Sequence, residues 1–169
     1  MTVPRVGIDL VPLARARQLV EPNHRAILER MLRSEEIDEC TRSGVLDASA
    51  VAGRLAVKEA VFKLLRTREP VVPWHGIAVR ATPGTWPEVH LSGHAAELAR
   101  HARLITPVAV SVAHDGDYAV GVATALAVHN DQAPTTASDT DHPREEHPHV
   151  PVDHSSTHER QEVGLVQAP

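Results

Sequence analysis

The segment VAVSVAHDGDYAVGVATALAV, residues 108–128, constrains the fold of this chain more than any other stretch. Over 108–114 valine alternates with alanine or serine, and an Asp-Gly pair follows at 115–116. Such a pair favours a type I′ turn, whose twist suits two antiparallel strands. The pattern predicts a β-hairpin with strands at 108–114 and 118–128, so the fold must contain an antiparallel sheet.

The remaining patterns up to residue 129 predict a mixture of helices and strands. Pro12 suits the first turn of a helix at 13–20, Ser34 is a candidate N-cap in a helical stretch at 23–42, and Asp47 can cap a long helix that ends near Leu65. Further segments are a buried strand at 5–11, two strands at 77–81 and 88–92 joined by a turn with TPGTWP, and a helix at 93–103. Together they predict a single α+β domain at 1–129, with an antiparallel sheet packed against a long helix.

The last forty residues differ in composition from the rest. Residues 130–169 carry five histidines, eight acidic and two basic side chains, and few large apolar residues. Such a segment cannot bury enough apolar surface to offset the entropy of ordering, so we expect a disordered His/acid/Pro-rich tail. The histidines could bind a transition metal weakly, but their spacing matches no defined zinc site, and a solvated tail is the simpler interpretation.

Composition excludes several classes of function. Residues 1–129 hold 15 basic and 14 acidic side chains, and aromatic residues make up 2% of the chain. Neither the basic face nor the stacking platforms of a nucleic-acid-binding protein are therefore expected. The single cysteine fits a reducing compartment, and no signal peptide or apolar run of about 20 residues is present. These features predict a cytoplasmic protein with no membrane partner.

The segment RLAVKEAVFKLL, residues 54–65, contains both lysines of a chain that has fifteen arginines. On a helix, Glu59 falls in a stripe of apolar residues with Leu55 and Phe62. A buried carboxylate requires a partner or a metal. Lys63 at i+4 could supply an ordinary helix-surface ion pair, and the helix alone favours that interpretation.

Two other segments offer a second interpretation. Asp9 ends the apolar run VGI, and His114 precedes the Asp-Gly pair of the hairpin. An aspartate and a glutamate from a strand and a helix can hold Mg²⁺, which takes one or two carboxylates and completes its shell with water and phosphates. Taken alone, Asp9 can be a strand-end cap and His114 a structural residue.

The order of these motifs is similar to that of a known family. GIDLV, RLAVKEAVFKLL, PEVHLSGHAAELA and VAVSVAHDGDYAVGVA, spanning about residues 3–128, resemble the holo-acyl-carrier-protein synthase family of small, single-domain 4′-phosphopantetheinyl transferases. The resemblance implies the 4′-phosphopantetheinyl transferase fold. It also implies Mg²⁺-dependent transfer of the phosphopantetheinyl arm of coenzyme A to a serine of an apo acyl carrier protein, with release of adenosine 3′,5′-bisphosphate.

The resemblance implies a role for each motif residue. Asp9 and Glu59 would bind Mg²⁺, Lys63 would stabilise the charge that develops on the pyrophosphate, and Lys58 would contact a phosphate. The general base is left open, with Glu59 acting through a metal-bound water as one option.

Three further residues are placed at the partners. His114 would bind the nucleotide end of coenzyme A, Arg15 would contact the acidic helix of the carrier, and Arg54 would serve either the carrier or the 3′-phosphate. The resemblance also implies a cyclic homotrimer in which Asp9, Glu59 and Lys63 come from one protomer and His114 from the next.

The chain departs from the family pattern at three places. Ala113 stands where serine is usual, Pro12 where an acidic residue is common, and Arg66-Thr67-Arg68 where a Gly-Thr-Gly is often found. Without these glycines, backbone N–H groups approach a phosphate less freely, but the side chains of Arg66 and Arg68 could contact the phosphate instead. Two alternative functions are a non-catalytic subunit that binds carrier protein or coenzyme A with the same fold, and a Mg²⁺-dependent pyrophosphate hydrolase.

Overall fold

The computed structural model describes residues 1–80 and 86–128 of the 169-residue chain. The described residues belong to one compact unit, Met1–Ala133. The predicted tail at 130–169 and most of the predicted turn at 82–87 lie outside the described residues. The domain boundary at residue 129 therefore stays a prediction.

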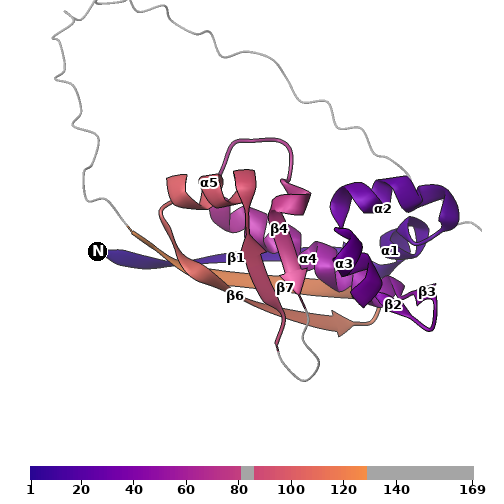
Figure 1. Cartoon of the computed structure of the whole chain (residues 1–169). Helices are drawn as coiled ribbons and strands as arrows, with labels where there is room; N and C mark the ends of the chain where they lie inside the picture. The colour runs from indigo at the N-terminus through magenta and orange to yellow at the C-terminus, as the bar shows by residue number, and fades with distance from the viewer. Residues whose placement is uncertain (81–85, 129–169) are drawn as a thin grey trace, which may run out of the picture. The chain divides into compact units, whose positions relative to one another are not determined.

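A three-stranded antiparallel sheet forms the base of the fold. Its order is β1 (Thr2–Pro12), β7 (Tyr118–Val128) and β6 (Leu104–Asp115), with β7 in the middle (Figure 1). The predicted hairpin is confirmed, but its turn lies one residue later, because Asp115 still pairs with Tyr118. Of the two turn residues, only Gly116 has a positive φ, of 53°. A type I′ turn requires a positive φ at both central residues, so this turn is not of the predicted type.

The long helix α4 (Ala48–Leu65) packs across one face of this sheet, mainly on β1 and β7. It begins as predicted at Asp47, whose carboxylate accepts hydrogen bonds from the backbone N–H groups of Ser49 at 2.8 Å and Ala50 at 3.3 Å. Twelve of its eighteen residues are buried, on nearly all sides of the helix. The fold is therefore α+β with an antiparallel sheet packed against a long helix, as predicted.

Two glycines allow α4 to approach the sheet closely. A Cβ atom on Gly7 of β1 would collide with the backbone carbonyl of Ala60, and one on Gly121 of β7 would collide with the backbone of Ala56. Only a residue without a side chain fits where backbones approach so closely. The glycines thus bring the helix carrying Glu59 against the strand carrying Asp9.

The other face of the sheet is exposed in the single chain. We predicted that the strand at 5–11 is buried, but Val6, Ile8 and Leu10 are 61%, 55% and 53% exposed. These three residues alternate along the strand with Gly7, Asp9 and Val11, which face α4; Gly7 and Val11 are buried there. The prediction was wrong for half of the strand, because α4 covers one face only.

Shorter elements surround one end and one side of α4. The predicted helix at 13–20 is confirmed as α1 (Leu13–Leu19), and the helix at 93–103 as α5 (Gly93–His101). The strands at 77–81 and 88–92 are confirmed as the antiparallel pair β4 (Ile77–Arg80) and β5 (Glu88–Leu91). Figure 1 shows α5 and α2 on the same side of the sheet as α4.

The helical stretch at 23–42 is interrupted. It consists of a short 3-10 turn (Pro22–His24), α2 (Arg25–Met31) and α3 (Ser34–Glu39), and it is followed by the two-residue strands β2 (Thr41–Arg42) and β3 (Val45–Leu46). A second 3-10 turn, η2 (Trp74–Gly76), precedes β4. Ser34 is the first residue of α3 and not its N-cap, which is Arg33. The Glu36 carboxylate instead accepts the N–H of Arg33 at 2.8 Å. None of the helices in the described part of the chain is long and apolar enough to cross a membrane.

Candidate active site

Asp9 and Glu59 meet where α4 touches β1. Asp9 lies two residues after Gly7 on the inward face of the strand, and Glu59 precedes Ala60, whose backbone contacts Gly7. Their side chains are 12% and 26% exposed. Burial, and then the nearby charge of Asp9, raise the pKa of Glu59 above its ordinary value, while Arg15 and Lys63 oppose the shift. A positive charge between the two carboxylates would relieve both effects.

Lys63 supplies a positive charge to this pair, but it does so at the strand. Its ammonium donates to Asp9 Oδ1 at 2.9 Å and to the carbonyl of Ile8 at 2.6 Å. The helix-surface ion pair between Glu59 and Lys63 is therefore not the arrangement found. Arg15 of α1 lies on the other side of Glu59, with 4.0 Å between its guanidinium and the carboxylate. The Lys63 side chain is 52% exposed, so it can leave Asp9 at little cost.

The oxygen ligands fit a hard cation that shares its shell with a substrate. Among residues 1–80 and 86–128, no group of three or more acidic, histidine or cysteine side chains could hold a metal on its own. Two carboxylates of different elements match a Mg²⁺ ion whose other ligands are water and phosphate oxygens. Asp9 and Glu59 are the residues that would hold such an ion.

His114 and Arg54 lie in a different place. They line a cavity of about 200 Å³, together with residues from α3, α4, β4 and the hairpin strand β6: Glu39, Ala50, Gly53, Val57, Val79 and Val112 among them. His114 Nε2 lies 3.0 Å from the carbonyl oxygen of Ser49. The Arg54 guanidinium donates to Glu39 at 2.6 Å, and only 8% of the residue is exposed.

The two groups of predicted residues belong to opposite edges of the sheet. Asp9 is on β1 and His114 is on β6, and β7 separates these strands. None of the residues around the His114 cavity is Asp9, Glu59 or Lys63. In a single chain the predicted residues therefore form two separate groups, Asp9, Glu59 and Lys63 at one place and His114 and Arg54 at another, here called the candidate half-sites.

Lys58 is not in either half-site, contrary to the predicted phosphate contact. Its side chain is fully buried, and its ammonium donates to Glu36 Oε2 at 2.7 Å and to the carbonyls of Trp74 at 2.9 Å and Met31 at 3.0 Å. All three N–H groups are thus used within the chain. Burial lowers the pKa of Lys58, although the Glu36 carboxylate opposes that shift. Lys58 therefore has no N–H group left for a phosphate, and the structure does not support the predicted contact.

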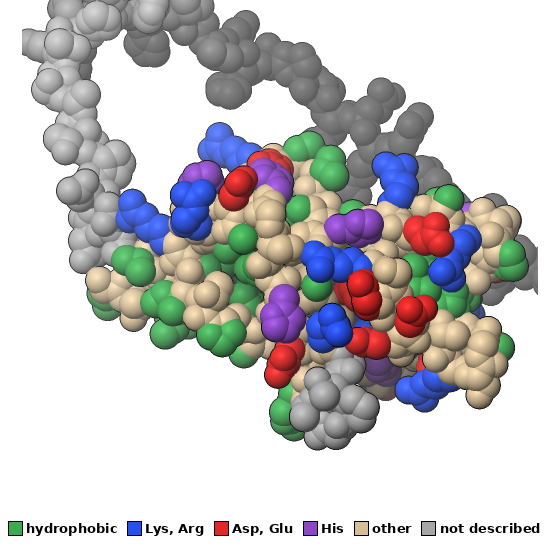
Figure 2. Space-filling view, viewed as in Figure 1, with side chains coloured by type: hydrophobic (Ala, Val, Ile, Leu, Met, Phe, Trp, Pro, Cys, Tyr) green, Lys and Arg blue, Asp and Glu red, His purple; other side chains and the backbone are tan. Residues whose placement is uncertain are grey.

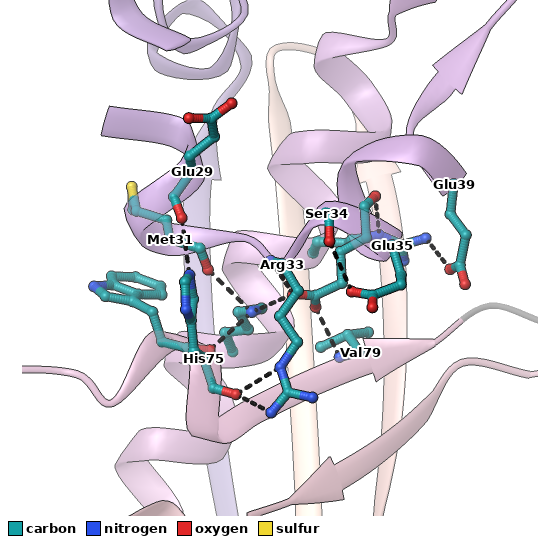
Figure 3. A network of polar contacts seen from close by, with 12 residues as sticks. Glu29, Met31, Arg33, Ser34, Glu35, Glu39, His75 and Val79 are labelled. Atoms are coloured by element: carbon teal, nitrogen blue, oxygen red, sulfur yellow. Dashed lines mark hydrogen bonds and ion pairs between the residues drawn. The ribbon is translucent and has the colours of Figure 1, made fainter. Parts of the chain in front are cut away.

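Lys58 belongs to a polar network that the sequence did not reveal (Figure 3). Glu36 accepts from Lys58, from the N–H of Arg33 and, through Oε1, from the N–H of Val79 at 2.8 Å. Arg33 itself donates to the carbonyl of His75. The network joins α3 and α4 to the start of β4. The sequence shows that Glu36 lies near the start of a helical stretch. It does not show that its partner is Lys58, which is 22 residues away.

Charged side chains of both signs lie close together on the surface. Figure 2 shows blue and red side chains interspersed on the face that it draws. Glu39, for example, pairs with Arg54 at 2.6 Å and with Arg80 at 3.2 Å. The charge on this face is therefore mixed and not of one sign.

Comparison with known proteins gives the same family as the motifs. Residues 5–123 match the model of the 4′-phosphopantetheinyl transferase superfamily. A holo-[acyl-carrier-protein] synthase of Desulforudis audaxviator is 39% identical over 121 residues, which cover 72% of this chain and 91% of the relative. One from Rhodopirellula baltica is 35% identical over 62% of this chain and 82% of the relative.

Solved structures share the fold. The holo-[acyl-carrier-protein] synthase of Helicobacter pylori in complex with coenzyme A aligns with a TM-score of 0.59 at 28% identity, covering 72% of this chain and 99% of that one. The acyl carrier protein synthase of Mycobacterium tuberculosis aligns with a TM-score of 0.53 at 28% identity, over 73% and 96%.

Proposed function

Because this chain belongs to the 4′-phosphopantetheinyl transferase superfamily, we propose that it is a holo-[acyl-carrier-protein] synthase. It transfers the phosphopantetheine group of coenzyme A to a serine of an apo acyl carrier protein and releases adenosine 3′,5′-bisphosphate. The observation that carries the proposal is the pairing of Asp9 and Glu59 beside Lys63 at the contact of β1 with α4. The cytoplasmic location predicted from the sequence belongs to the same proposal.

Asp9 and Glu59 hold Mg²⁺ in this proposal. The ion supplies charge neutralisation at the pyrophosphate when it is bound. Lys63 places a further positive charge next to Asp9. When the substrate binds, the half-exposed ammonium of Lys63 would contact a phosphate oxygen, where its charge stabilises the bond-breaking transition state.

The reaction forms one bond and breaks one. The serine oxygen of the carrier attacks the phosphorus that bears the pantetheine arm, and the bond from that phosphorus to the bridging oxygen of the pyrophosphate breaks. The serine proton must leave during this step. The carboxylate of Glu59 lies at the proposed metal site, within reach of a water that could carry this proton. Glu59, directly or through one water, is thus our candidate for the general base.

The two half-sites support a shared active site in a cyclic homotrimer. A head-to-tail ring joins two different surfaces at each interface, so the β1 edge of one protomer can face the β6 edge of the next. His114 and Arg54 of one protomer would then bind the nucleotide end of the coenzyme A held at Asp9 and Glu59 of its neighbour. Arg15, 53% exposed beside Glu59, is placed to contact the acidic carrier.

The exposed face of the sheet also favours assembly. Several of its large apolar side chains are more than two-fifths exposed in the single chain: Val6, Ile8, Leu10, Leu126 and Val128. An apolar surface of this kind commonly marks a protein–protein contact. Packing of three such sheets against one another would bury it.

Weighing the carrier protein tests the function. The protein is incubated with coenzyme A, Mg²⁺ and an apo acyl carrier protein, and we expect the carrier to gain the mass of phosphopantetheine. Hydrolysis of coenzyme A without this gain would indicate the pyrophosphate hydrolase, and no reaction would indicate the non-catalytic binding subunit. The variant Glu59→Gln should fold normally and lose transfer, whereas near-normal activity at low Mg²⁺ would refute the assignment of the site.

Mixing inactive variants tests the shared site. Asp9→Asn and His114→Ala should each be nearly inactive, and refolding them together should restore part of the activity, because some interfaces then combine two intact half-sites. Asp9→Asn mixed with Glu59→Gln should stay inactive, since both changes affect the same half-site. The shared-site proposal fails if mixed trimers form without recovery, or if sedimentation shows only monomer.

A further inference from the structure

Three arginines from separate parts of the sequence line one cavity. The cavity has a volume of about 410 Å³ and lies between the start of β1, the end of α4 and the end of α5. Arg5 comes from β1, Arg66 follows α4 and Arg103 follows α5. The other lining residues are Leu65, Thr67, Leu98, His101 and Ala102.

The positive charge of this cavity has no counterpart in the described part of the chain. None of the three arginines forms an ion pair with a carboxylate there, and no acidic residue lines the cavity. Burial, and then the charge of Arg66, lower the pKa of Arg5, with no acidic residue opposing the shift. Guanidinium groups that lie together in this way are stabilised by an anion between them.

Arg5 also has unused hydrogen-bonding capacity. Its Nε is buried and has no partner within residues 1–80 and 86–128. Its Nη1 makes a single long contact of 3.5 Å with the carbonyl of Leu64. A buried donor without an acceptor is unfavourable, and an unplaced ligand is one of its ordinary explanations.

The backbone places Arg66 and Arg103 in an unusual conformation. Their φ angles are 49° and 55°, in the left-handed region that glycine or asparagine normally occupies after a helix. Arginine is unfavourable in the left-handed region. Arg66 and Arg103, which both follow a helix in this conformation, both line the same cavity. Residues held in this conformation are typical of ligand-binding positions.

We propose that Arg5, Arg66 and Arg103 form a binding site for a phosphoryl oxyanion, separate from the carboxylate pair. Arginine presents several N–H donors in one plane, which match the oxygens of a phosphate group. Arg5 precedes Asp9 by four residues on the same face of β1, so the two sites are about 13 Å apart along the strand. The anion is either a phosphate group of coenzyme A or a free phosphate, and both have the required chemistry.

Calorimetric titration of the full chain with inorganic phosphate, at constant ionic strength against chloride, tests the proposal without use of the transfer reaction. The test variant is Arg66→Gly/Arg103→Gly, in which glycine suits the left-handed backbone and should leave folding intact. The matched control is Arg68→Gly/Arg100→Ala, which removes the same charge from positions outside the cavity. We expect phosphate affinity to fall at least about tenfold in the test variant, because charge-assisted hydrogen bonds are lost, and to change little in the control.

Titration with coenzyme A and with its 3′-dephospho form distinguishes the two sources. If the 3′-phosphate occupies the cavity, the test variant loses affinity for coenzyme A but not for the dephospho form, and the nucleotide end of coenzyme A then lies at this cavity and not at His114 and Arg54. If a free phosphate occupies it, both affinities stay as in the wild type while phosphate binding is lost. The proposal is wrong if wild-type protein binds no phosphate, or if test and control variants bind it equally. Weakened carrier binding with unchanged phosphate affinity would also overturn it and assign the cluster to the acidic protein partner.

Discussion

Replacement of Lys58 by methionine should destabilise the fold severely. The substitution keeps most of the side-chain volume but removes an ammonium that satisfies the carboxylate of Glu36 and two backbone carbonyls, all in a site with no solvent exposure. Removing one partner of a buried ion pair costs about 3–5 kcal/mol, because the other charge stays buried without compensation. Since a domain of this size is stable by about 5–15 kcal/mol, the loss is a large part of the total.

Urea unfolding of wild type and variant at the same protomer concentration measures this loss. Lys63→Met is the matched control, because the same chemical change on the same helix affects a half-exposed side chain and should cost at most about 1 kcal/mol. In Lys58→Met/Glu36→Gln the amide can still accept the N–H of Val79 and no buried charge is left. The double variant should therefore lose less stability than the sum of the single changes. The reasoning is refuted if Lys58→Met costs no more than Lys63→Met.

Three other changes have defined outcomes. Gly7→Ala should cost about 1–3 kcal/mol in urea unfolding and also lower transfer, because the added methyl group pushes the backbone at Ala60, and with it α4, away from β1; unchanged stability would contradict the close approach. Hydrogen bonds that His94 donates to the carboxylates of Glu69 and then Glu97 raise the pKa of His94 above 6.5, so the stability that His94 contributes is complete below pH 6.5 and is lost as the pH rises through the raised pKa. The melting temperatures of wild type and His94→Gln should accordingly differ more at pH 5.5 than at pH 8.5, and a constant difference would exclude the effect. Deletion of 131–169 should leave melting temperature and turnover nearly unchanged, and a large fall in either would show that the tail contributes to the folded unit.

The elements predicted best were those determined by neighbouring residues. The hairpin and its strands followed from alternation and an Asp-Gly pair, and the start of α4 followed from Asp47. The exposure of Ile8 could not be predicted, because an apolar residue in a strand gives no sign of which face another element covers. The interruption of the helical stretch at 23–42 was missed for a similar reason, since the packing of α3 on distant residues decides where it begins.

The candidate site was predictable only in part. The motifs identified Asp9, Glu59 and Lys63, and the structure brings these three together through two glycines whose role the sequence did not reveal. The pairing of Lys63 with Asp9 was missed, because helix periodicity considers only neighbours at i+4. The phosphate contact of Lys58 was implied by the family resemblance alone, whereas successive residues on a helix point about 100° apart, and Lys58 faces Glu36 instead.

The two lysines of an arginine-rich chain have different tasks, and both depend on the shape of the ammonium. At Lys58, three acceptors from α2, α3 and η2 surround one nitrogen at 2.7–3.0 Å. An ammonium can meet acceptors in three directions, whereas the donors of arginine lie in one plane and require more space. This contact joins α4 to α2, α3 and η2. Lys58 therefore serves the packing of the fold, while Lys63, five residues further along the helix and half-exposed beside Asp9, is the lysine that the proposed function assigns to the substrate.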